Sequence, residues 1–273
     1  MRTMRATSLL LLVFLGMASG PAGLCACGRA ATAKLAERPT LQKAGKVSQS
    51  QPPVVVADEG IPVCNHQPAG TSQIFRGPVY LSPDGRHRAY AENESHARGS
   101  GEGCEDCTNN SRLFVADTPD AVFRLVLLQS PSRYELGNWI KIIDWSPDSR
   151  FLLFEEGGFQ YCSDAGGSAP RCYEAESGIF SEENGPGSVP YAFSQMLNKD
   201  CEVAVQALGF SPDGGLVLKA FPWFELGDEE PSNDSCLKKE GLWLLEAKAG
   251  KLSPLPNDYK VVRYSTAEKG VTK

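Results

Sequence analysis

Two cysteines, Cys104 and Cys107, have the spacing in this chain that could most directly do chemistry. A Cys-x-x-Cys pair can carry out thiol–disulfide exchange when a nearby cation or a helix N-terminus lowers the pKa of one thiol. Here the neighbouring side chains are Glu102, Glu105 and Asp106, whose negative charges disfavour a thiolate. We therefore expect Cys104 and Cys107 to form structural disulfides, and a redox or metal role is the alternative.

A metal site is the second chemistry that the side chains could support. Structural zinc takes four ligands, usually from paired Cys or His motifs, and the three histidines of the chain have no matching spacing. We interpret His87 as an exposed strand histidine. Oxygen ligands for calcium gather at Asp228, Glu230 and Asp234, but their order does not match an EF-hand loop. We predict no metal and no cofactor, and keep these acidic residues as a weak calcium candidate.

The composition and the missing motifs exclude several functions. The 273 residues carry a formal net charge of −6, and the first 27 contain two arginines and no acid, so the remainder is more acidic still. An acidic body argues against nucleic acid or an anionic membrane surface as the partner. The sequence has no nucleophile elbow, phosphate-binding loop or dinucleotide-binding fingerprint. We therefore assign no catalytic residue.

The N-terminal segment 1–27 is predicted to be an export signal. Two arginines precede the apolar run 9–15, which is too short to span a bilayer but has the form of a signal h-region. Cleavage after the small residues 18–20 would release a secreted protein. Alternatively, residues 24–27 resemble a bacterial lipobox in which Cys27 is lipidated. We expect an exported protein that is secreted, or lipid-anchored in the periplasm or at the cell surface, with no other membrane contact.

Export also sets the expectation for the cysteines. Residues 28–57 mix Ala, Lys, Gln, Ser and Pro without an apolar face, and we interpret them as a flexible tether or a frayed terminus. The folded body is then 58–273, and its seven cysteines should form disulfides in an oxidising compartment. The simplest pairings leave one thiol over and are Cys162 with Cys172, Cys201 with Cys236, and Cys64 with Cys104 or Cys107.

One phrase occurs three times and organises the body. Each copy places Ser-Pro-Asp between two apolar stretches, a pattern typical of a hairpin. Pro sets φ at the second turn position, and the Ser and Asp oxygens can accept backbone N–H groups. A glycine follows in the first and third copies, whereas Ser149 takes its place in the second, which predicts some backbone strain. The turn residues are Ser82, Pro83, Asp84, Ser146, Pro147, Asp148, Ser211, Pro212 and Asp213.

Further strands recur at nearly constant distance from each turn. The three copies begin near residues 78, 140 and 203, so each is predicted to be one multi-stranded unit. The predicted third strands are 112–115, 178–180 and 241–244, and the predicted fourth strands are 123–128 and 251–255. Trp145 ends a first strand and Trp243 lies in a third strand. We therefore expect both side chains to pack in the core.

These turns and strands resemble the TolB-like repeat, a WD-type blade of a β-propeller, over roughly residues 75–258. The resemblance implies an all-β fold of three four-stranded blade units. Three blades are fewer than the about four to eight that usually close a ring. The repeat period also exceeds the about 40–45 residues of WD-type blades. We therefore predict a partial or irregular β-propeller.

The extra length of each copy falls between its second and third strands, at 92–111, 155–177 and 222–240. Equivalent insertions project from the same side of equivalent blades. This side would be acidic, with Glu155 and Glu156 among its residues. We interpret it as a partner-binding surface, or alternatively as solvent-facing loops.

Propellers host binding modules, scaffolds and enzymes, so the resemblance alone does not assign an activity. Because no catalytic motif occurs, we predict a non-catalytic binding or scaffolding module of the cell envelope or the exterior, with a protein or glycan partner. The alternative is an enzyme of the envelope, either a thiol–disulfide protein using Cys104 and Cys107 or an accessory hydrolase. A third hypothesis is a homodimer in which two open half-rings complete a larger propeller.

Three Asn-x-Ser sequences begin at Asn93, Asn109 and Asn233. They are acceptors for N-glycosylation only in a eukaryotic secretory pathway. If the lipobox is functional, they are coincidental.

Overall fold

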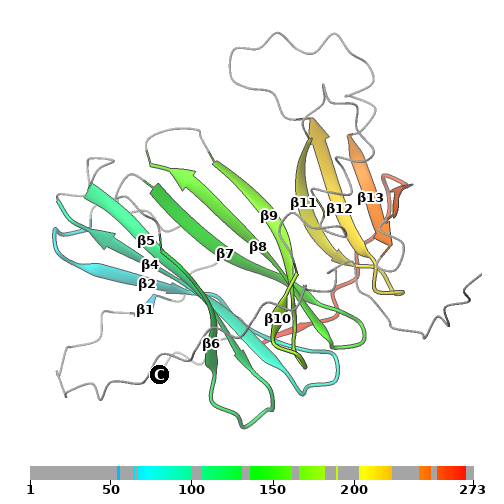
Figure 1. The fold of residues 1–273 in the computed structure, drawn as a ribbon, viewed down its shortest axis with the longest axis horizontal. Helices are drawn as coiled ribbons and strands as arrows, with labels where there is room; N and C mark the ends of the chain where they lie inside the picture. Colours follow the sequence, from blue (N-terminus) through cyan, green and yellow to red (C-terminus); the bar gives the residue numbers. More distant parts are fainter. Residues whose placement is uncertain are drawn as a thin grey trace, which may run out of the picture.

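The structure is a computed structural model that describes residues 54–55, 64, 67–99, 106–130, 136–161, 166–181, 189, 203–222, 240–246 and 251–268. Its strands form three sheets, which follow one another in chain order (Figure 1). Each sheet corresponds to one copy of the repeat, and neighbouring strands of the repeat pair antiparallel. The all-β class predicted from the sequence is confirmed. No helix among the described residues is long and apolar enough to cross a membrane.

The first sheet contains a four-strand meander whose first strand is broken. Both β2 and β3 pair with β4, so they are two halves of one strand interrupted at Gly77 and Pro78. Two short strands extend the outer edge of these halves: β1 pairs parallel with β2, and β15 pairs antiparallel with β3. The strands are β1 (Val54–Val55), β2 (Ser72–Arg76), β3 (Val79–Leu81), β4 (Arg88–Ala97), β5 (Cys107–Ala116), β6 (Arg124–Gln129) and β15 (Thr266–Glu268).

The second and third sheets are simple meanders in which consecutive strands are neighbours. The second sheet consists of β7 (Leu136–Trp145), β8 (Phe151–Gln160), β9 (Gly166–Glu174) and β10 (Ile179–Phe180). The third consists of β11 (Val203–Phe210), β12 (Leu216–Pro222), β13 (Gly241–Glu246) and β14 (Lys251–Leu255). In each sheet the Ser-Pro-Asp turn joins the first strand to the second, as the repeat predicts.

The predicted strand order of the second copy is wrong in one place. Residues 178–180 were expected to form its third strand, but Ile179 and Phe180 form the fourth strand, β10. The third strand is β9, which lies inside the predicted insertion 155–177. Its first half is rich in glycine and lacks the apolar alternation that indicates a strand. Phe180 therefore lies in a fourth strand, whereas Trp243 lies in the third strand of its sheet, which corresponds to β5 in the first sheet.

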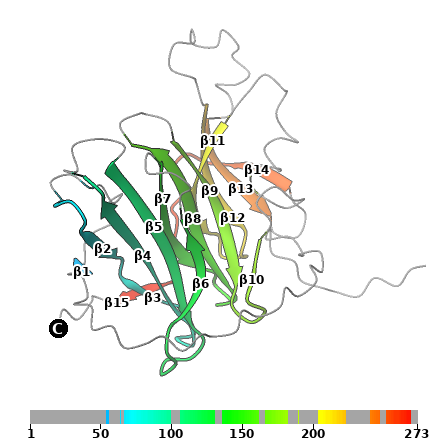
Figure 2. The same ribbon diagram turned by 60° about the vertical axis from the view of Figure 1, so that its left-hand side comes forward.

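The insertions of the first two copies are mostly strand rather than loop. β4 and β5 pair continuously from Arg88 with Ala116 to Ala97 with Cys107. β8 and β9 pair up to Phe159 with Gly166. The long hairpins β4–β5 and β8–β9 extend on the same side of the first two sheets, at the strand ends opposite the Ser-Pro-Asp turns, as Figure 2 shows. Residues 223–239 of the third insertion, which was predicted at 222–240, lie outside the described residues.

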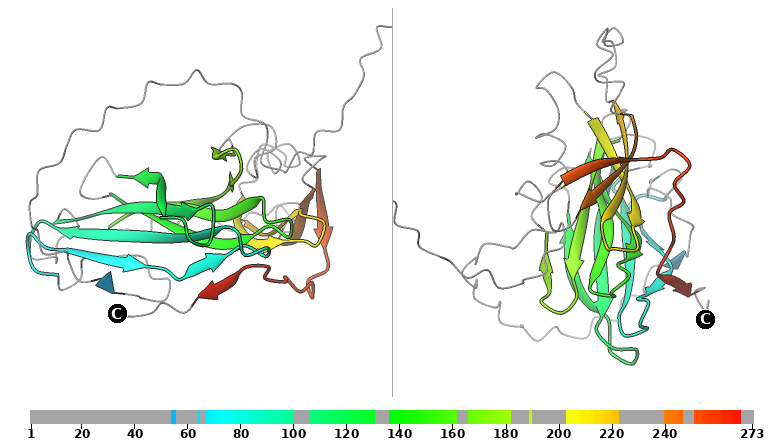
Figure 3. Two further views of the ribbon diagram at one scale, coloured as in Figure 1. Left: turned by 90° about the horizontal axis from the view of Figure 1, so that it is seen from below. Right: turned by 90° about the vertical axis from the view of Figure 1, so that its right-hand side faces the viewer.

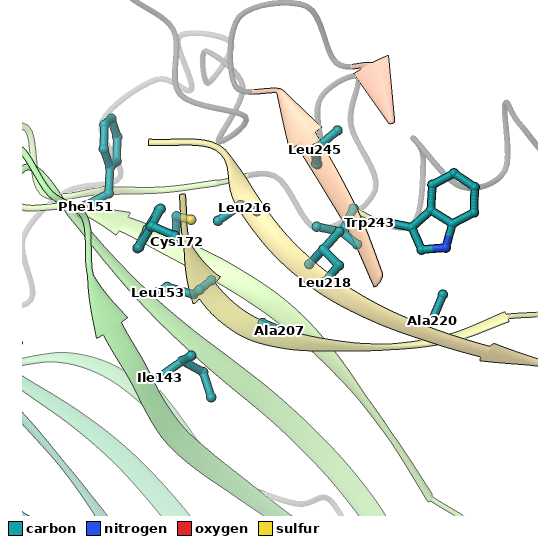
Figure 4. Packing of buried hydrophobic residues seen from close by; sticks show 12 residues of the cluster. Ile143, Phe151, Leu153, Cys172, Ala207, Leu216, Leu218, Ala220, Trp243 and Leu245 are labelled. Atoms are coloured by element: carbon teal, nitrogen blue, oxygen red, sulfur yellow. The ribbon is translucent and has the colours of Figure 1, made fainter. Parts of the chain in front are cut away.

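Two hydrophobic clusters hold the three sheets together. One lies between the first and second sheets and includes Leu113, Trp145 and Phe154, each fully buried. The other lies between the second and third sheets, where Leu153 faces Leu218 (Figure 4). Trp145 and Trp243 both belong to these clusters, so their predicted place in the core is confirmed.

The C-terminal segment crosses the first strands of all three sheets. After β14 it passes β11, where a Cβ atom on Gly209 would lie 2.9 Å from Val261 Cγ1. It then passes β7, where Arg263 donates to the carbonyl of Ile143. It ends as β15 on the edge of β3, and Figure 3 shows this path below the sheets. The segment 256–268, which we call the C-terminal strap, therefore connects the three sheets.

Asp144 anchors the strap to the second sheet. Its carboxylate is fully buried and accepts the N–H of Tyr264 at 3.1 Å and the N–H of Ser265 at 2.8 Å. It also accepts the N–H of Trp145 at 2.9 Å. Three backbone donors thus satisfy a buried charge that would otherwise be costly to desolvate.

Candidate functional site

The Ser and Asp side chains of the Ser-Pro-Asp phrase form hydrogen bonds within the turn. In the first copy the Ser82 hydroxyl donates to Asp84 Oδ1 at 2.6 Å and accepts the N–H of His87 at 2.9 Å. The hydroxyls of Ser146 and Ser211 accept the corresponding N–H groups at 2.9 and 3.0 Å. Hydrogen bonds to Ser82 and Arg86 help to lower the pKa of Asp84, against the effect of desolvation, which raises it. These residues therefore have a structural role.

Ser149 has the strained backbone that the sequence predicts. Its φ is 64°, close to the 71° of Gly85 and the 79° of Gly214 at the equivalent places. Its hydroxyl accepts the N–H of Asp84 at 3.1 Å, so the side chain connects the turns of the first and second sheets. This hydrogen bond offsets part of the backbone strain at Ser149. The glycines of the other two copies have no hydroxyl and cannot make it.

The cysteine pairs can be followed in part. Cys64 forms a disulfide with Cys107, one of the two pairings expected for Cys64, and both residues are buried. Cys172 is also disulfide-bonded. A Cys104–Cys107 disulfide is therefore not formed in this structure. The other predicted sites lie outside the described residues: Cys27, Cys104, Cys162, Cys201, Cys236, Asp228, Glu230 and Asp234.

His87 is buried, contrary to the expectation of an exposed strand histidine. It is 7% exposed, and its ring stacks on Trp145 of the second sheet with 5.6 Å between centroids. The cause is the turn, because the hydrogen bond from the His87 N–H to Ser82 places the ring against the neighbouring sheet. Among the described residues, no group of three or more His, Cys, Asp or Glu is placed to hold a metal ion.

Asparagine side chains of the first sheet cover the open edge of β7. Asn109 Oδ1 accepts the N–H of Asn138 at 2.9 Å, and Asn109 Nδ2 donates to the Asn138 carbonyl. Asn93 Oδ1 accepts the N–H of Ile140 at 3.3 Å. These contacts satisfy backbone groups that an edge strand would leave unpaired. Asn109 is fully buried, so in the folded protein it is closed to glycosylation.

Between the second and third sheets, a carboxylate satisfies a backbone N–H group of the edge strand β11. Glu155 is 4% exposed, and its Oε1 accepts the N–H of Ala207 at 2.9 Å. Burial raises the pKa of Glu155, while the Ala207 N–H and the charge of Lys141 oppose that rise. The expected acidic, solvent-facing side is therefore wrong for Glu155. Glu156, the next residue, forms an ion pair with Arg171 at 2.6 Å.

An open groove of about 690 Å³ lies above Glu155, between the second and third sheets. It is at the strand ends opposite the Ser-Pro-Asp turns, on the side of the long hairpins. Three aromatic residues, Trp139, Phe159 and Phe221, line it. Three polar residues, Glu155, Ser168 and Gln206, also line it. The rest of the lining is small or aliphatic and consists of Gly158, Gly166, Gly167, Val203, Ala204 and Val205.

Cross-strand pairing with glycine sets the position of two of these rings. Trp139 pairs with Gly157 and Phe159 pairs with Gly137 across β7 and β8. Each ring occupies the space that a Cβ atom on its glycine would take. Trp139 and Phe159 can therefore lie flat over the sheet. Flat aromatic rings beside small residues favour apolar and stacking contacts with a ligand.

The chain has little detectable similarity to known proteins. Its sequence matches no family model and no curated protein. A solved structure assigned as TolB from Agrobacterium tumefaciens aligns with 67% of this chain and 46% of its own, at 14% identity and a TM-score of 0.32. This chain thus spans about half the length of that protein. The all-β fold stands on the strands described above, and the propeller remains a prediction.

Apart from Glu155, the groove residues were not among the candidates that the sequence indicated. The three aromatic residues Trp139, Phe159 and Phe221 belong to no sequence motif. The available signal was the alternation of aromatic residues with glycine around Gly137 and Gly157. It becomes meaningful only when the register of β7 and β8 is known, because the rings and the glycines are on different strands.

Proposed function

We propose that this chain is an exported, non-catalytic binding module that holds a protein or glycan partner in the groove between its second and third sheets. The groove is the observation that carries the proposal, because it combines three aromatic residues with an open, small-residue floor. It also lies on the side from which the long hairpins project.

Two observations support the proposed compartment. The Cys64–Cys107 disulfide and the further disulfide at Cys172 are typical of oxidising compartments such as the periplasm or the exterior. The apolar segment 9–15 fits the same route. Lipidation at Cys27, the blade identity of the three sheets and a homodimer of half-rings belong to the proposal as hypotheses.

The proposal can be tested with two ligand libraries. The purified chain is exposed to a displayed library of random linear peptides and to a glycan array. Ser168 is exposed in the groove, so Ser168→Arg fills the groove without removing a buried contact. The matched control is Leu128→Ala on β6, which is 53% exposed and distant from the groove.

We expect ligands of one class to bind the wild type and the Leu128→Ala variant equally. Ser168→Arg should weaken them by about tenfold or more, the equivalent of about 1.4 kcal/mol. Circular dichroism of each variant checks that the fold is kept. Binding that Ser168→Arg leaves unchanged, or no binding in either library, would contradict the proposal.

A further inference from the structure

The first strands of the three sheets present equivalent outer edges, and these edges are occupied differently. The position eight residues before the turn serine is Ile74 in the first sheet, Asn138 in the second and Val203 in the third. Ile74 pairs with Val54 of β1, so a strand occupies the first edge. Asn109 bonds both backbone groups of Asn138, so side chains occupy the second edge.

The third edge has backbone groups that no described residue hydrogen-bonds. β11 is the terminal strand of its sheet, and the N–H of Ala207 points away from β12 to Glu155. Alternate residues of a strand direct their N–H and C=O to the same side, so those of Val205 and Val203 also point away from β12. Within the described part of the chain, no backbone or side-chain group hydrogen-bonds these two residues on that side.

The second sheet does not cap this edge because glycines replace the two asparagines. The strand registers place Gly157 where the first sheet has Asn93, since both stand eleven residues after the turn serine. They place Gly166, the partner of Phe159, where the first sheet has Asn109, the partner of Ser95. These two positions of the second sheet therefore carry no polar side chain that could cap Val203 or Val205, and the Trp139 ring lies at Gly157 instead.

We propose that an extended peptide segment of a partner protein adds to β11 in this groove as an extra strand. The inference rests on the proposed function and names the partner class. The N–H and C=O groups of Val203 and Val205 bond the peptide backbone, in the way that β2 takes β1. Alternate side chains of the peptide then face Trp139 and Phe159 on one side and Phe221 on the other.

The test follows individual amide protons. The probe is the tightest peptide from the random linear library, added to the full chain labelled with ¹⁵N. Without the peptide, the N–H groups of Val203 and Val205 should exchange fast with solvent, while that of Gln206, which faces β12, is protected. With the peptide, exchange at Val203 and Val205 should slow by about tenfold or more, as for newly paired strand amides.

N-methylated peptides give an independent readout. Methyl groups on alternate residues remove the N–H groups of one edge of the peptide only. Methylation in one of the two registers should weaken binding by about tenfold or more, and methylation in the other should have little effect, because a strand uses one edge for pairing.

The two proposals fail in different ways. If only glycans bind in a Ser168-dependent manner, the binding module stands and strand addition is wrong. A second outcome also overturns strand addition alone. In it, Ser168→Arg blocks peptide binding, but the bound peptide leaves the N–H groups of Val203 and Val205 unprotected or tolerates methylation in both registers. If Ser168→Arg affects no ligand, the proposed function fails. Gly167→Arg, at another groove position with open space for a side chain, is the second blocking variant.

Discussion

Glu155 is the residue at which packing and charge oppose each other. Its carboxylate holds the N–H of Ala207, but burial disfavours the ionised form and raises the pKa. The folded state therefore binds the proton of Glu155 more tightly than the unfolded chain does. This contribution to stability is full below the unfolded pKa, and it is lost as the pH rises through the folded pKa.

Two substitutions separate the charge of Glu155 from its hydrogen bond. Glu155→Gln keeps an oxygen acceptor for Ala207 and removes the buried charge, so its stability at neutral pH should equal or exceed that of the wild type. Glu155→Ala leaves the N–H of Ala207 without a partner and should cost about 1–3 kcal/mol. Urea unfolding at several pH values measures both effects.

The pH series supplies the decisive comparison for Glu155. In the wild type, the free energy of unfolding should decrease as the pH rises from the ordinary pKa of a glutamate to the raised value. Glu155→Gln should lose this part of the slope. If Glu155→Gln and Glu155→Ala lost equal stability at neutral pH, the charge of Lys141 rather than the N–H donor of Ala207 would be the important partner of Glu155.

At the scale of elements, the turns were predictable and the third strand of the second sheet was not. The turns depend on residues next to each other in sequence, because Ser82 bonds Asp84 and His87 directly. Strand β9 begins with Gly166 and Gly167, whose missing side chains remove the alternation on which sequence interpretation depends. Pairing with β8 makes it a strand.

The groove could not be predicted for a related reason. It depends on which residues the register places opposite Gly157 and Gly166, and on β11 crossing the face of the second sheet. Gly157 and Gly166 are equivalent to Asn93 and Asn109 only when the strand pairing of two sheets is compared. That comparison relates residues far apart in the chain. The sequence indicated only the side of the molecule, through the insertions.

The Cys64–Cys107 disulfide is an element-scale staple with a measurable effect. It joins the segment before β2 to the start of β5, across a sequence separation of 43. Closing a loop of this length in the unfolded chain stabilises the fold by on the order of 4 kcal/mol in the chain-entropy model. The double variant Cys64→Ala/Cys107→Ala should therefore have a clearly lower melting temperature.

The control for this disulfide is the wild type with its disulfides intact. Free thiols are counted in each protein under denaturing conditions. The double variant should show no thiol beyond those of the wild type. A single Cys107→Ala variant should gain the thiol of Cys64. If the melting temperature of the double variant equalled that of the wild type, the staple would contribute nothing to the stability of the first sheet.

At the scale of the whole molecule, neither hydrophobic cluster joins all three sheets, so a further connection is needed for them to unfold together. One cluster joins the first sheet to the second, and the other joins the second to the third. The C-terminal strap is the element that reaches all three first strands, through Val261, Arg263 and β15. It connects the sheets without a closed ring, so a three-sheet protein can unfold as one cooperative unit.

Asp144→Ala tests this role of the strap. The substitution removes the acceptor for Tyr264, Ser265 and Trp145, and hydrogen bonds to a charged group are each worth about 1.5–3 kcal/mol. We expect a loss of about 3 kcal/mol or more, and a broader transition in which the first sheet separates from the other two before they unfold. Val262→Ala, at a strap residue that is 53% exposed, is the matched control and should unfold like the wild type.

A chain ending at Asp258 should reproduce the broad transition, because it lacks β15 as well. If Asp144→Ala and this truncation both unfolded in a single transition at the wild-type temperature, packing between the sheets alone would explain the cooperativity, and the strap would be a surface extension.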